Sequence, residues 1–159
     1  MDFEQPWWLG LLPICFTVIC GYQLLKEQRS LFTFEDAQTM AAELKVYGQL
    51  SPDRYASLDD RTADSFGILR GYAGALDRSK LTFAPADLNG NPGFAYTITA
   101  RGLNKGDCLD LEPNTLFDSV AVNGQTLDRN SMSLDQMQEL CHSTFWPWAD
   151  GNIVTLKGS

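Results

Sequence analysis

The side chains with the most reactive chemistry in this 159-residue chain are four cysteines and a single histidine. Cys108 and Cys141 lie in the polar part of the chain, whereas Cys15 and Cys20 lie in an apolar run, where thiols behave as small hydrophobic groups. The sequence has no Cys-x-x-Cys motif and no Cys/His cluster, so it predicts no zinc or other metal site. The placement favours a disulfide between Cys108 and Cys141; the alternative is two unrelated buried thiols. A disulfide would place this part of the chain outside the cytoplasm.

Other catalytic patterns are missing from the sequence. His142 directly follows Cys141, and adjacent residues of a helix point in different directions, so they do not predict a nucleophile and its base. The carboxylates of residues 57–60, Asp64 and Asp87 do not have the spacing of a calcium loop. Glycine-rich nucleotide-binding patterns are absent. The sequence therefore predicts neither an enzyme nor a cofactor.

The charge balance argues against nucleic acid as a partner. The formal net charge is −8, and the lysines and arginines do not cluster. Binding to a phosphate backbone requires clustered cations, so this class of partner is not expected.

Residues 7–25 contain no charged side chain, which predicts a single membrane-spanning helix. A helix needs roughly 20 apolar residues to cross a bilayer. A cleaved secretory signal fits less well, because residues 1–5 carry Asp2 and Glu4 and no basic residue. The third alternative is a core helix of a soluble protein. The residues expected to form the anchor are Trp7, Trp8, Leu11, Ile14, Phe16, Val18, Ile19 and Leu24.

Two signals disagree about orientation in the membrane. Lys26 and Arg29 follow the apolar run, and the positive-inside rule would then place the rest of the chain in the cytoplasm. A disulfide predicts the opposite orientation. We give the cysteines more weight, because two cations partly offset by Glu27 are a weak topological signal.

The residues after the apolar run continue with good helix formers. Phe34, Ala37, Ala41 and Leu44 recur at intervals of three and four, which predicts an amphipathic helix whose apolar face packs on a folded domain. The pattern also allows a hinge in this helix near residues 30–33. The predicted organisation is a transmembrane anchor at residues 1–29, the amphipathic continuation of its helix at residues 30–50, and a globular domain at residues 51–159.

The globular part reads as an α+β domain with a small antiparallel sheet packed on one helix. Residues 80–88 and 93–103 predict a hairpin closed by an Asn-Gly turn, with Phe94, Tyr96, Ile98 and Ala100 on the buried face. A short helix or turn, a strand at 119–124, a helix capped by Ser133 and Gln136, and a final strand at 152–159 follow. Ser51 and Pro52 predict the start of a further short segment.

The tryptophans at positions 146 and 148 flank Pro147. Trp146 and Trp148 would be costly to expose, so they are expected either to cover the edge of the sheet near Cys141 or to contact a partner protein.

Four short motifs in the second half resemble the type IVb subgroup of type IV pilins. In that family an alternating strand runs into a Gly-Leu segment ending in Cys, and a short strand, a helix ending in Leu-Cys and a last strand follow. The corresponding stretches here are "FAYTITARGLNKGDC", "SVAVNG", "MQELC" and "NIVTLKG". This match covers residues 93–158, whereas residues 7–50 resemble the family in architecture only.

The resemblance implies a minor pilin or a pilin-like accessory component. Such a protein is a non-enzymatic subunit of a pilus or of a related conjugation or secretion apparatus. It would be anchored in the bacterial inner membrane with its domain in the periplasm, and could be assembled into an extracellular pilus that serves cell adhesion. Its partners would be other pilin subunits, through Glu4 and the apolar helix, and the assembly machinery. The alternative is a bitopic membrane protein that does not polymerise and has a periplasmic binding domain. The family's processing motif before an N-terminal glutamate is absent here.

Overall fold

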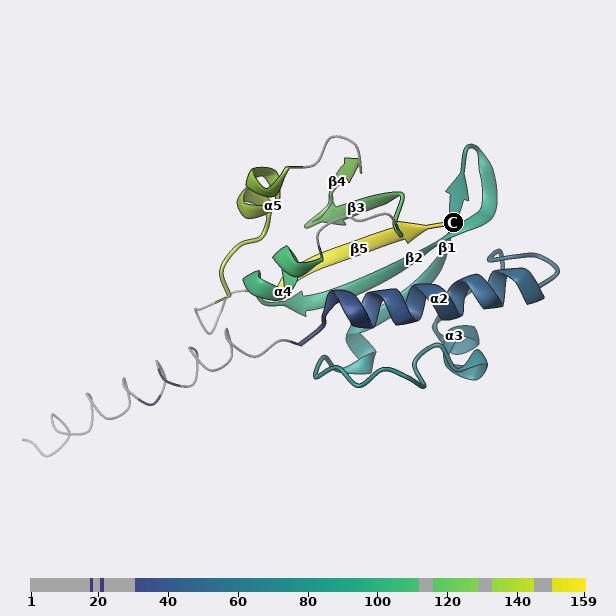
Figure 1. The fold of residues 1–159 in the computed structure, drawn as a ribbon, viewed down its shortest axis with the longest axis horizontal. Coiled ribbons are helices and arrows are strands. Elements are labelled where there is room, and N and C mark those ends of the chain that lie inside the picture. Colours follow the sequence, from purple (N-terminus) through teal and green to yellow (C-terminus); the bar gives the residue numbers. More distant parts are fainter. Residues whose placement is uncertain (1–17, 19–20, 22–30, 112–115, 129–132, 145–149) are drawn as a thin grey trace, which may run out of the picture.

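The computed structural model describes residues 18, 21, 31–111, 116–128, 133–144 and 150–159. The fold is a mixed domain in which a helix lies across one face of a five-stranded antiparallel sheet (Figure 1). The elements are α2 (Phe34–Leu50), α3 (Asp60–Phe66), a 3₁₀ turn η1 (Arg78–Lys80), β1 (Leu81–Leu88), β2 (Asn91–Leu103), α4 (Lys105–Asp110), β3 (Ser119–Val122), β4 (Gln125–Asp128), α5 (Leu134–Leu140) and β5 (Asn152–Gly158). The predicted α+β class is confirmed.

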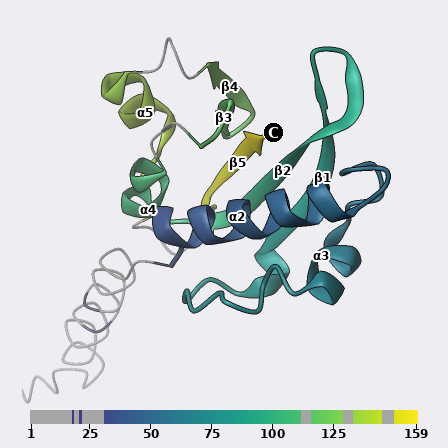
Figure 2. The same ribbon diagram turned by 45° about the vertical axis from the view of Figure 1, so that its right-hand side comes forward.

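The sheet has the order β1-β2-β5-β3-β4, so the last strand of the chain fills its centre. β5 pairs with β2 on one side and with β3 on the other, in both cases antiparallel. Helices α4 and α5 lie together at one end of the sheet, and α4 lies close to the start of α2 (Figure 2). Residues far apart in the sequence therefore meet at this end.

Helix α2 begins at Phe34 because Thr33 caps it. The Thr33 side chain accepts a hydrogen bond from the Asp36 amide, and the Asp36 carboxylate accepts one from the Thr33 amide, which is a complete capping box. Residues 31–33 are not helical, so the described helix does not extend over the full predicted range of 30–50. This break coincides with the hinge position, near residues 30–33, that the sequence pattern allows.

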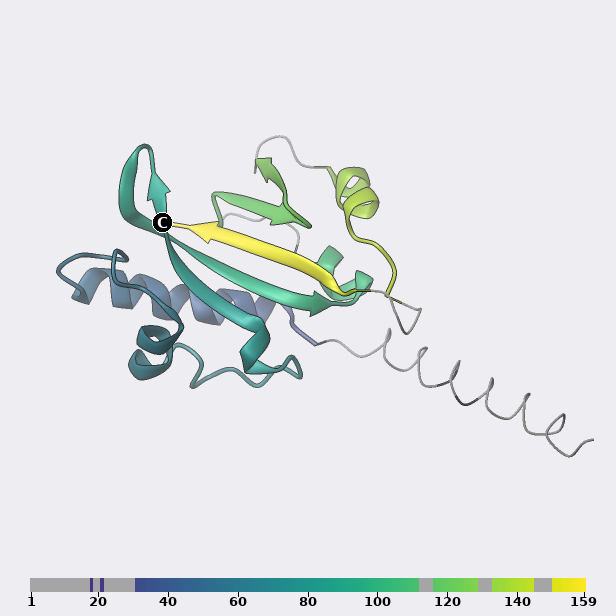
Figure 3. The same cartoon turned by 180° about the vertical axis from the view of Figure 1, so that it is seen from behind.

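The face of α2 toward the sheet is apolar, as its spacing predicts. Its buried residues are Ala37, Met40, Ala41, Leu44 and Tyr47. They form one core with the inward side chains of the central strands, including Tyr96, Ile98 and Leu156. The opposite face of the sheet, seen from behind in Figure 3, is polar at its centre, where the hydroxyls of Thr99 and Thr155 lie 2.9 Å apart.

The hairpin of β1 and β2 turns at Asn89 and Gly90, whose φ angles are 51° and 83°. This confirms the predicted turn, because both residues tolerate positive φ. Phe94 departs from the expected buried face and is 41% exposed. Phe94 is the fourth residue of β2, close to the hairpin turn, and the Arg54 guanidinium covers its ring at 4.6 Å from the centroid.

The sequence analysis missed two short elements, helix α3 and strand β4. Residues 52–57 form turns instead of the segment expected after Ser51, and α3 begins later, after its cap Asp59. The carboxylate of Asp60 accepts a hydrogen bond of 2.6 Å from the Phe83 amide on edge strand β1. Strand β4 pairs with β3 through a second Asn-Gly turn at Asn123 and Gly124.

Candidate functional site

The disulfide between Cys108 and Cys141 is present and joins α4 to the end of α5. The Cα atoms are 5.9 Å apart, and both residues are fully buried. The two cysteines are 33 residues apart in sequence, so the chain-entropy model assigns the bond about 3–4 kcal/mol of stabilisation. Its thiols are consumed, so Cys141 offers no nucleophile to His142.

The buried carboxylate of Asp107, the residue before Cys108, holds the point at which the chain enters the described domain. Its Oδ2 accepts hydrogen bonds from the Leu31 amide at 2.6 Å and the Phe32 amide at 3.3 Å. The Asn104 side chain caps α4 by accepting from the Asp107 amide at 2.8 Å and donates to Oδ2 at 3.2 Å. One carboxylate thus joins the entry segment, residues 31–34, to the disulfide-bonded helix.

The entry segment is also held from its other side. The Leu31 carbonyl accepts from the Leu76 amide at 2.8 Å and from the Tyr72 hydroxyl at 3.2 Å. Phe32 is fully buried, and its ring lies 6.1 Å from that of Tyr72. Because donors and acceptors of consecutive residues are satisfied by different elements, the segment has a fixed position on the domain.

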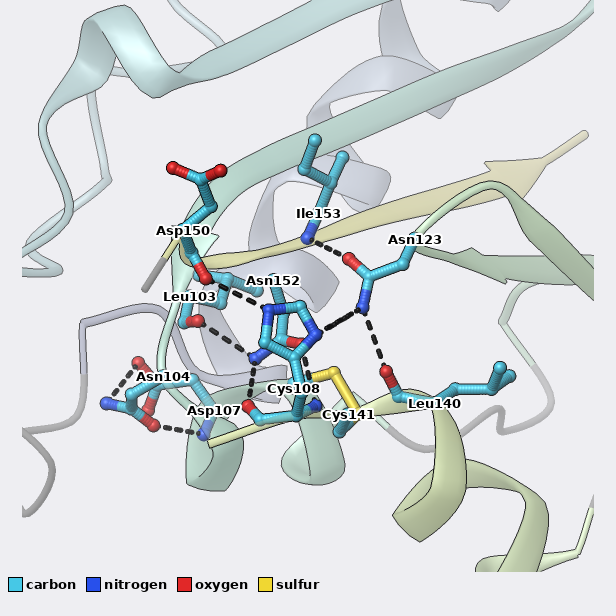
Figure 4. Close-up of a disulfide and its surroundings, with 11 residues drawn as sticks. Leu103, Asn104, Asp107, Cys108, Asn123, Leu140, Cys141, Asp150, Asn152 and Ile153 are labelled. Carbon is cyan, nitrogen blue, oxygen red and sulfur yellow. Dashed lines mark hydrogen bonds between the residues drawn. A yellow bond between two sulfur atoms is a disulfide. The ribbon is translucent and has the colours of Figure 1, made fainter. Parts of the chain in front are cut away.

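Asn152, at the start of β5, fastens the chain after the disulfide to the sheet (Figure 4). This fully buried amide donates to the carbonyls of Leu103 at 3.1 Å and His142 at 2.9 Å. Its oxygen accepts from the His142 amide at 3.0 Å and from the Asn123 side chain at 3.0 Å. All of its hydrogen-bonding capacity is therefore used.

Asn123 in the β3–β4 turn completes the same network (Figure 4). Its side-chain nitrogen donates to the Leu140 carbonyl at 2.8 Å and lies 3.2 Å from Nδ1 of His142, while its oxygen accepts from the Ile153 amide at 2.9 Å. Nε2 of His142 lies 3.0 Å from the Asp150 carbonyl, which assigns the proton to Nε2. We use the name disulfide corner for the region formed by residues 31–34, helix α4, Asn123, Cys141, His142 and Asn152.

The chemistry of the disulfide corner is structural. The His142 ring is engaged by Asn123 and a backbone carbonyl, and the cysteines are bonded to each other. Within the described ranges, no group of three His, Cys, Asp or Glu side chains is placed to hold a metal ion.

The residues of α2 expected to pack against other subunits lie in or against the core of this chain. Ala37, Ala41 and Leu44 are buried, and Phe34 is partly buried against the same core. This confirms that the apolar stripe covers the chain's own domain. Packing of the helix against other subunits stays a prediction.

Several predicted site residues lie outside the described residues. They are Glu4, Trp7, Trp8, Leu11, Ile14, Phe16, Ile19, Leu24, Trp146 and Trp148. Val18 is described and is 65% exposed. In the portions of the chain that the structure describes, no helix combines the length and the apolar character required to cross a bilayer.

The sequence reasoning missed Asp107, Asn123 and Asn152. Asn104 and Asp107 are spaced as a helix cap and its third residue, so a local signal marked the start of α4. No local signal indicates that the same carboxylate binds residues 31 and 32, because these partners are more than 70 positions away.

Comparison with solved structures finds the crystal structure of a type IVb pilin from Salmonella typhi. The match has a TM-score of 0.59 at 14% sequence identity, and it covers 77% of this chain and 94% of that chain. The sequence matches no protein-family model and no curated protein. The resemblance inferred from the short motifs is thus confirmed at the level of the fold, which is that of a type IVb pilin.

Proposed function

We propose that this chain is a pilin-like structural subunit, without enzymatic activity, of a type IVb pilus or a related conjugation or secretion apparatus. The observation that carries the proposal is the type IVb pilin fold. The disulfide corner adds support, since it joins the entry segment to the domain through Asp107 beside a buried disulfide. In a filament, force passes between the N-terminal helix of a subunit and its domain. A rigid connection between the entry segment and the domain suits that role.

The proposal includes an inner-membrane anchor at residues 1–29 and a periplasmic domain. The uncharged run at residues 7–25 supports the anchor, and the disulfide supports an oxidising compartment. Contacts with other subunits would be made by the N-terminal segment, with Glu4 as the candidate for a charge pair between subunits. The assembly machinery is then the second partner.

The second candidate function is a bitopic membrane protein that does not polymerise and serves a pilus basal body or secretion system through a periplasmic binding domain. One observation favours it: a cavity of about 590 Å³ lies at the carboxyl end of α2. A binding domain needs such a cavity, whereas a purely structural subunit does not.

The test is made in bacteria that assemble a type IVb pilus and produce the full chain. Surface filaments are sheared off and separated from membranes, and both fractions are analysed by immunoblot and intact mass. We expect the chain in both fractions, and the intact mass shows whether its N-terminus has been trimmed or methylated. Cys108 and Cys141 should resist alkylation until they are reduced.

The fractions distinguish the two candidates. A chain found in membranes alone, with an unmodified N-terminus, would support the bitopic protein and reject the subunit. Free thiols at Cys108 and Cys141 in the native membranes would contradict both, because each requires an extracytoplasmic domain. A strain lacking the filament's major subunit is the control, since the sheared fraction should then contain none of the chain.

A further inference from the structure

The cavity at the carboxyl end of α2 lies away from the disulfide corner, which adjoins the amino end of the same helix (Figure 1). Its volume of about 590 Å³ is typical of small-molecule sites, which span about 300–1,000 Å³. It is lined by Lys45, Gly48, Gln49, Ser51, Pro52, Arg54, Tyr55 and Ser159. The last turn of α2 and the turns that follow it supply nearly the whole wall.

Lys45 and Arg54 bring two positive charges to this cavity in a chain whose net charge is −8. The neighbouring carboxylate of Asp53 accepts hydrogen bonds from the hydroxyls of Ser51 at 2.7 Å and Ser57 at 2.5 Å. These bonds hold the pKa of Asp53 below its usual value. Asp53 is thus engaged by hydroxyl groups rather than by either cation.

Arg54 is held in a costly conformation. Its φ of 56° lies in the left-handed region, which non-glycine residues seldom adopt. Its guanidinium packs over the Phe94 ring, 4.6 Å from the centroid. A guanidinium stacked by its face keeps its N–H groups free to donate in its plane. Strained residues of this kind cluster at ligand-binding loops.

Tyr55 forms a fixed aromatic part of the wall. A Cβ on Gly48 would lie 2.4 Å from the Tyr55 ring, so only glycine at this place allows the ring to lie against the helix. The ring is also packed by Tyr47 and Tyr96, with centroids 6.3 and 5.1 Å away. The wall is therefore formed before any ligand arrives, which lowers the entropic cost of binding.

We propose that this cavity binds a small polyhydroxylated anion, either a sugar acid or a sugar phosphate. Lys45 and Arg54 pair with the carboxylate or phosphate, and Gln49 and Ser51 exchange hydrogen bonds with hydroxyl groups. Pro52 contacts a C–H face of the sugar, and the buried Tyr55 ring closes this part of the wall. The proposal is independent of assembly into a pilus, because the cavity is built within one chain.

The test is a titration of the full chain in detergent micelles, followed by the backbone amide signals in NMR. The probes are glucuronate and glucose 6-phosphate, with glucose as the neutral control. We expect saturable shifts of the Gly48, Gln49, Arg54 and Tyr55 amides with at least one anion and none with glucose. A response to one anion identifies whether the site prefers the carboxylate or the phosphate.

Matched variants locate the site. Lys45→Gln and Arg54→Gln should each weaken binding about tenfold, the usual effect of removing one charge-assisted hydrogen bond. Arg70→Gln, which removes an exposed charge outside the cavity, should leave the affinity unchanged. Lys45 lies on a regular helix, so Lys45→Gln remains informative even where Arg54→Gln perturbs the fold.

Three results would overturn the proposal. They are the absence of saturable shifts with both anions, equal binding of glucose, or unchanged affinity in Lys45→Gln. Each of these results would remove the observation that favours the bitopic alternative, whereas the pilin-like subunit is tested separately by the filament fractions.

Discussion

At the scale of single residues, the carboxylate of Asp107 carries the joint between the entry segment and the domain. Asp107→Ala leaves the amides of Leu31 and Phe32 without their acceptor in a buried place. We expect the free energy of unfolding to fall by about 3 kcal/mol, since hydrogen bonds to charged groups contribute about 1.5–3 kcal/mol each. Urea titration measures this loss.

The matched control is Asp110→Ala on the same helix. Asp110 is exposed and accepts one long hydrogen bond, 3.4 Å from the Phe34 amide, so its loss should cost less than about 1 kcal/mol. Equal losses in the two variants would show that the buried carboxylate has no special role.

The hydroxyl of Tyr96, unlike the carboxylate of Asp107, is a buried polar group whose removal should not destabilise the fold. It is buried and has no hydrogen-bond partner among the described residues, so Tyr96→Phe should be neutral or stabilise the fold by about 1 kcal/mol. Tyr72→Phe is the comparison, because its hydroxyl donates toward the carbonyls of Leu76 and Leu31. That variant should lose about 1 kcal/mol. Thermal unfolding of both variants checks the contrast, and destabilisation by Tyr96→Phe would contradict it.

The same two phenols predict instability at alkaline pH. Burial, with a smaller contribution from Asp36, raises the pKa of Tyr72 to about 12, and burial also raises that of Tyr96. In the unfolded chain both ionise near their ordinary value of about 10, so above that pH the folded state binds more protons. This contribution is complete below pH of about 10 and is lost as the pH rises toward the folded pKa. Unfolding measured from pH 8 to 12 should show it, with a smaller slope in Tyr96→Phe.

What could be predicted from sequence at this scale depends on how local the signal is. Asn89–Gly90 and the capping pair Ser133 and Gln136 were found because each acts within four positions. The pairing of Cys108 with Cys141 was found because few cysteines compete. The bond from Asp107 to Leu31 has no local pattern, since it exists only after the sheet has brought α4 beside the entry segment.

At the scale of elements, the strongly patterned ones were predicted, and β4 and α3, which were missed, are short and weakly patterned. β2 alternates apolar and polar residues over much of its length, and α2 carries an apolar face over 17 residues. By contrast, β4 has only four residues. Helix α3 has seven residues, and Ala63 is the one buried residue among those seven. Such elements are fixed by their neighbours in space, here β3 and β1, and not by their own periodicity.

The elements joined by the disulfide should loosen together when it is reduced. Reduction removes the covalent link between α4 and α5, whereas the long β1–β2 pairing is independent of it. We expect faster amide hydrogen exchange in α4, α5 and residues 31–34, and unchanged exchange in the centre of β2. Exchange followed by mass spectrometry with and without reductant measures this. Uniform acceleration over the sheet would show that the bond supports the whole fold and not the disulfide corner alone.

At the scale of the whole molecule, the fold, the oxidised cysteine pair and the uncharged N-terminal run all bear on where the chain folds. If residues 1–29 direct the domain out of the cytoplasm, their removal should leave it in a reducing compartment, where structural disulfides rarely persist. In cells producing residues 30–159, Cys108 and Cys141 should then react with an alkylating agent before any reductant is added. In the full chain, Cys108 and Cys141 should react only after reduction. Intact mass of alkylated protein from the two strains distinguishes these states.

The baseline is the full chain with both Cys108→Ser and Cys141→Ser, which has no thiol at either position. Equal protection in the full and shortened chains would mean that the N-terminal residues do not decide the compartment, and the anchor would have to be abandoned while the pilin-like fold remained.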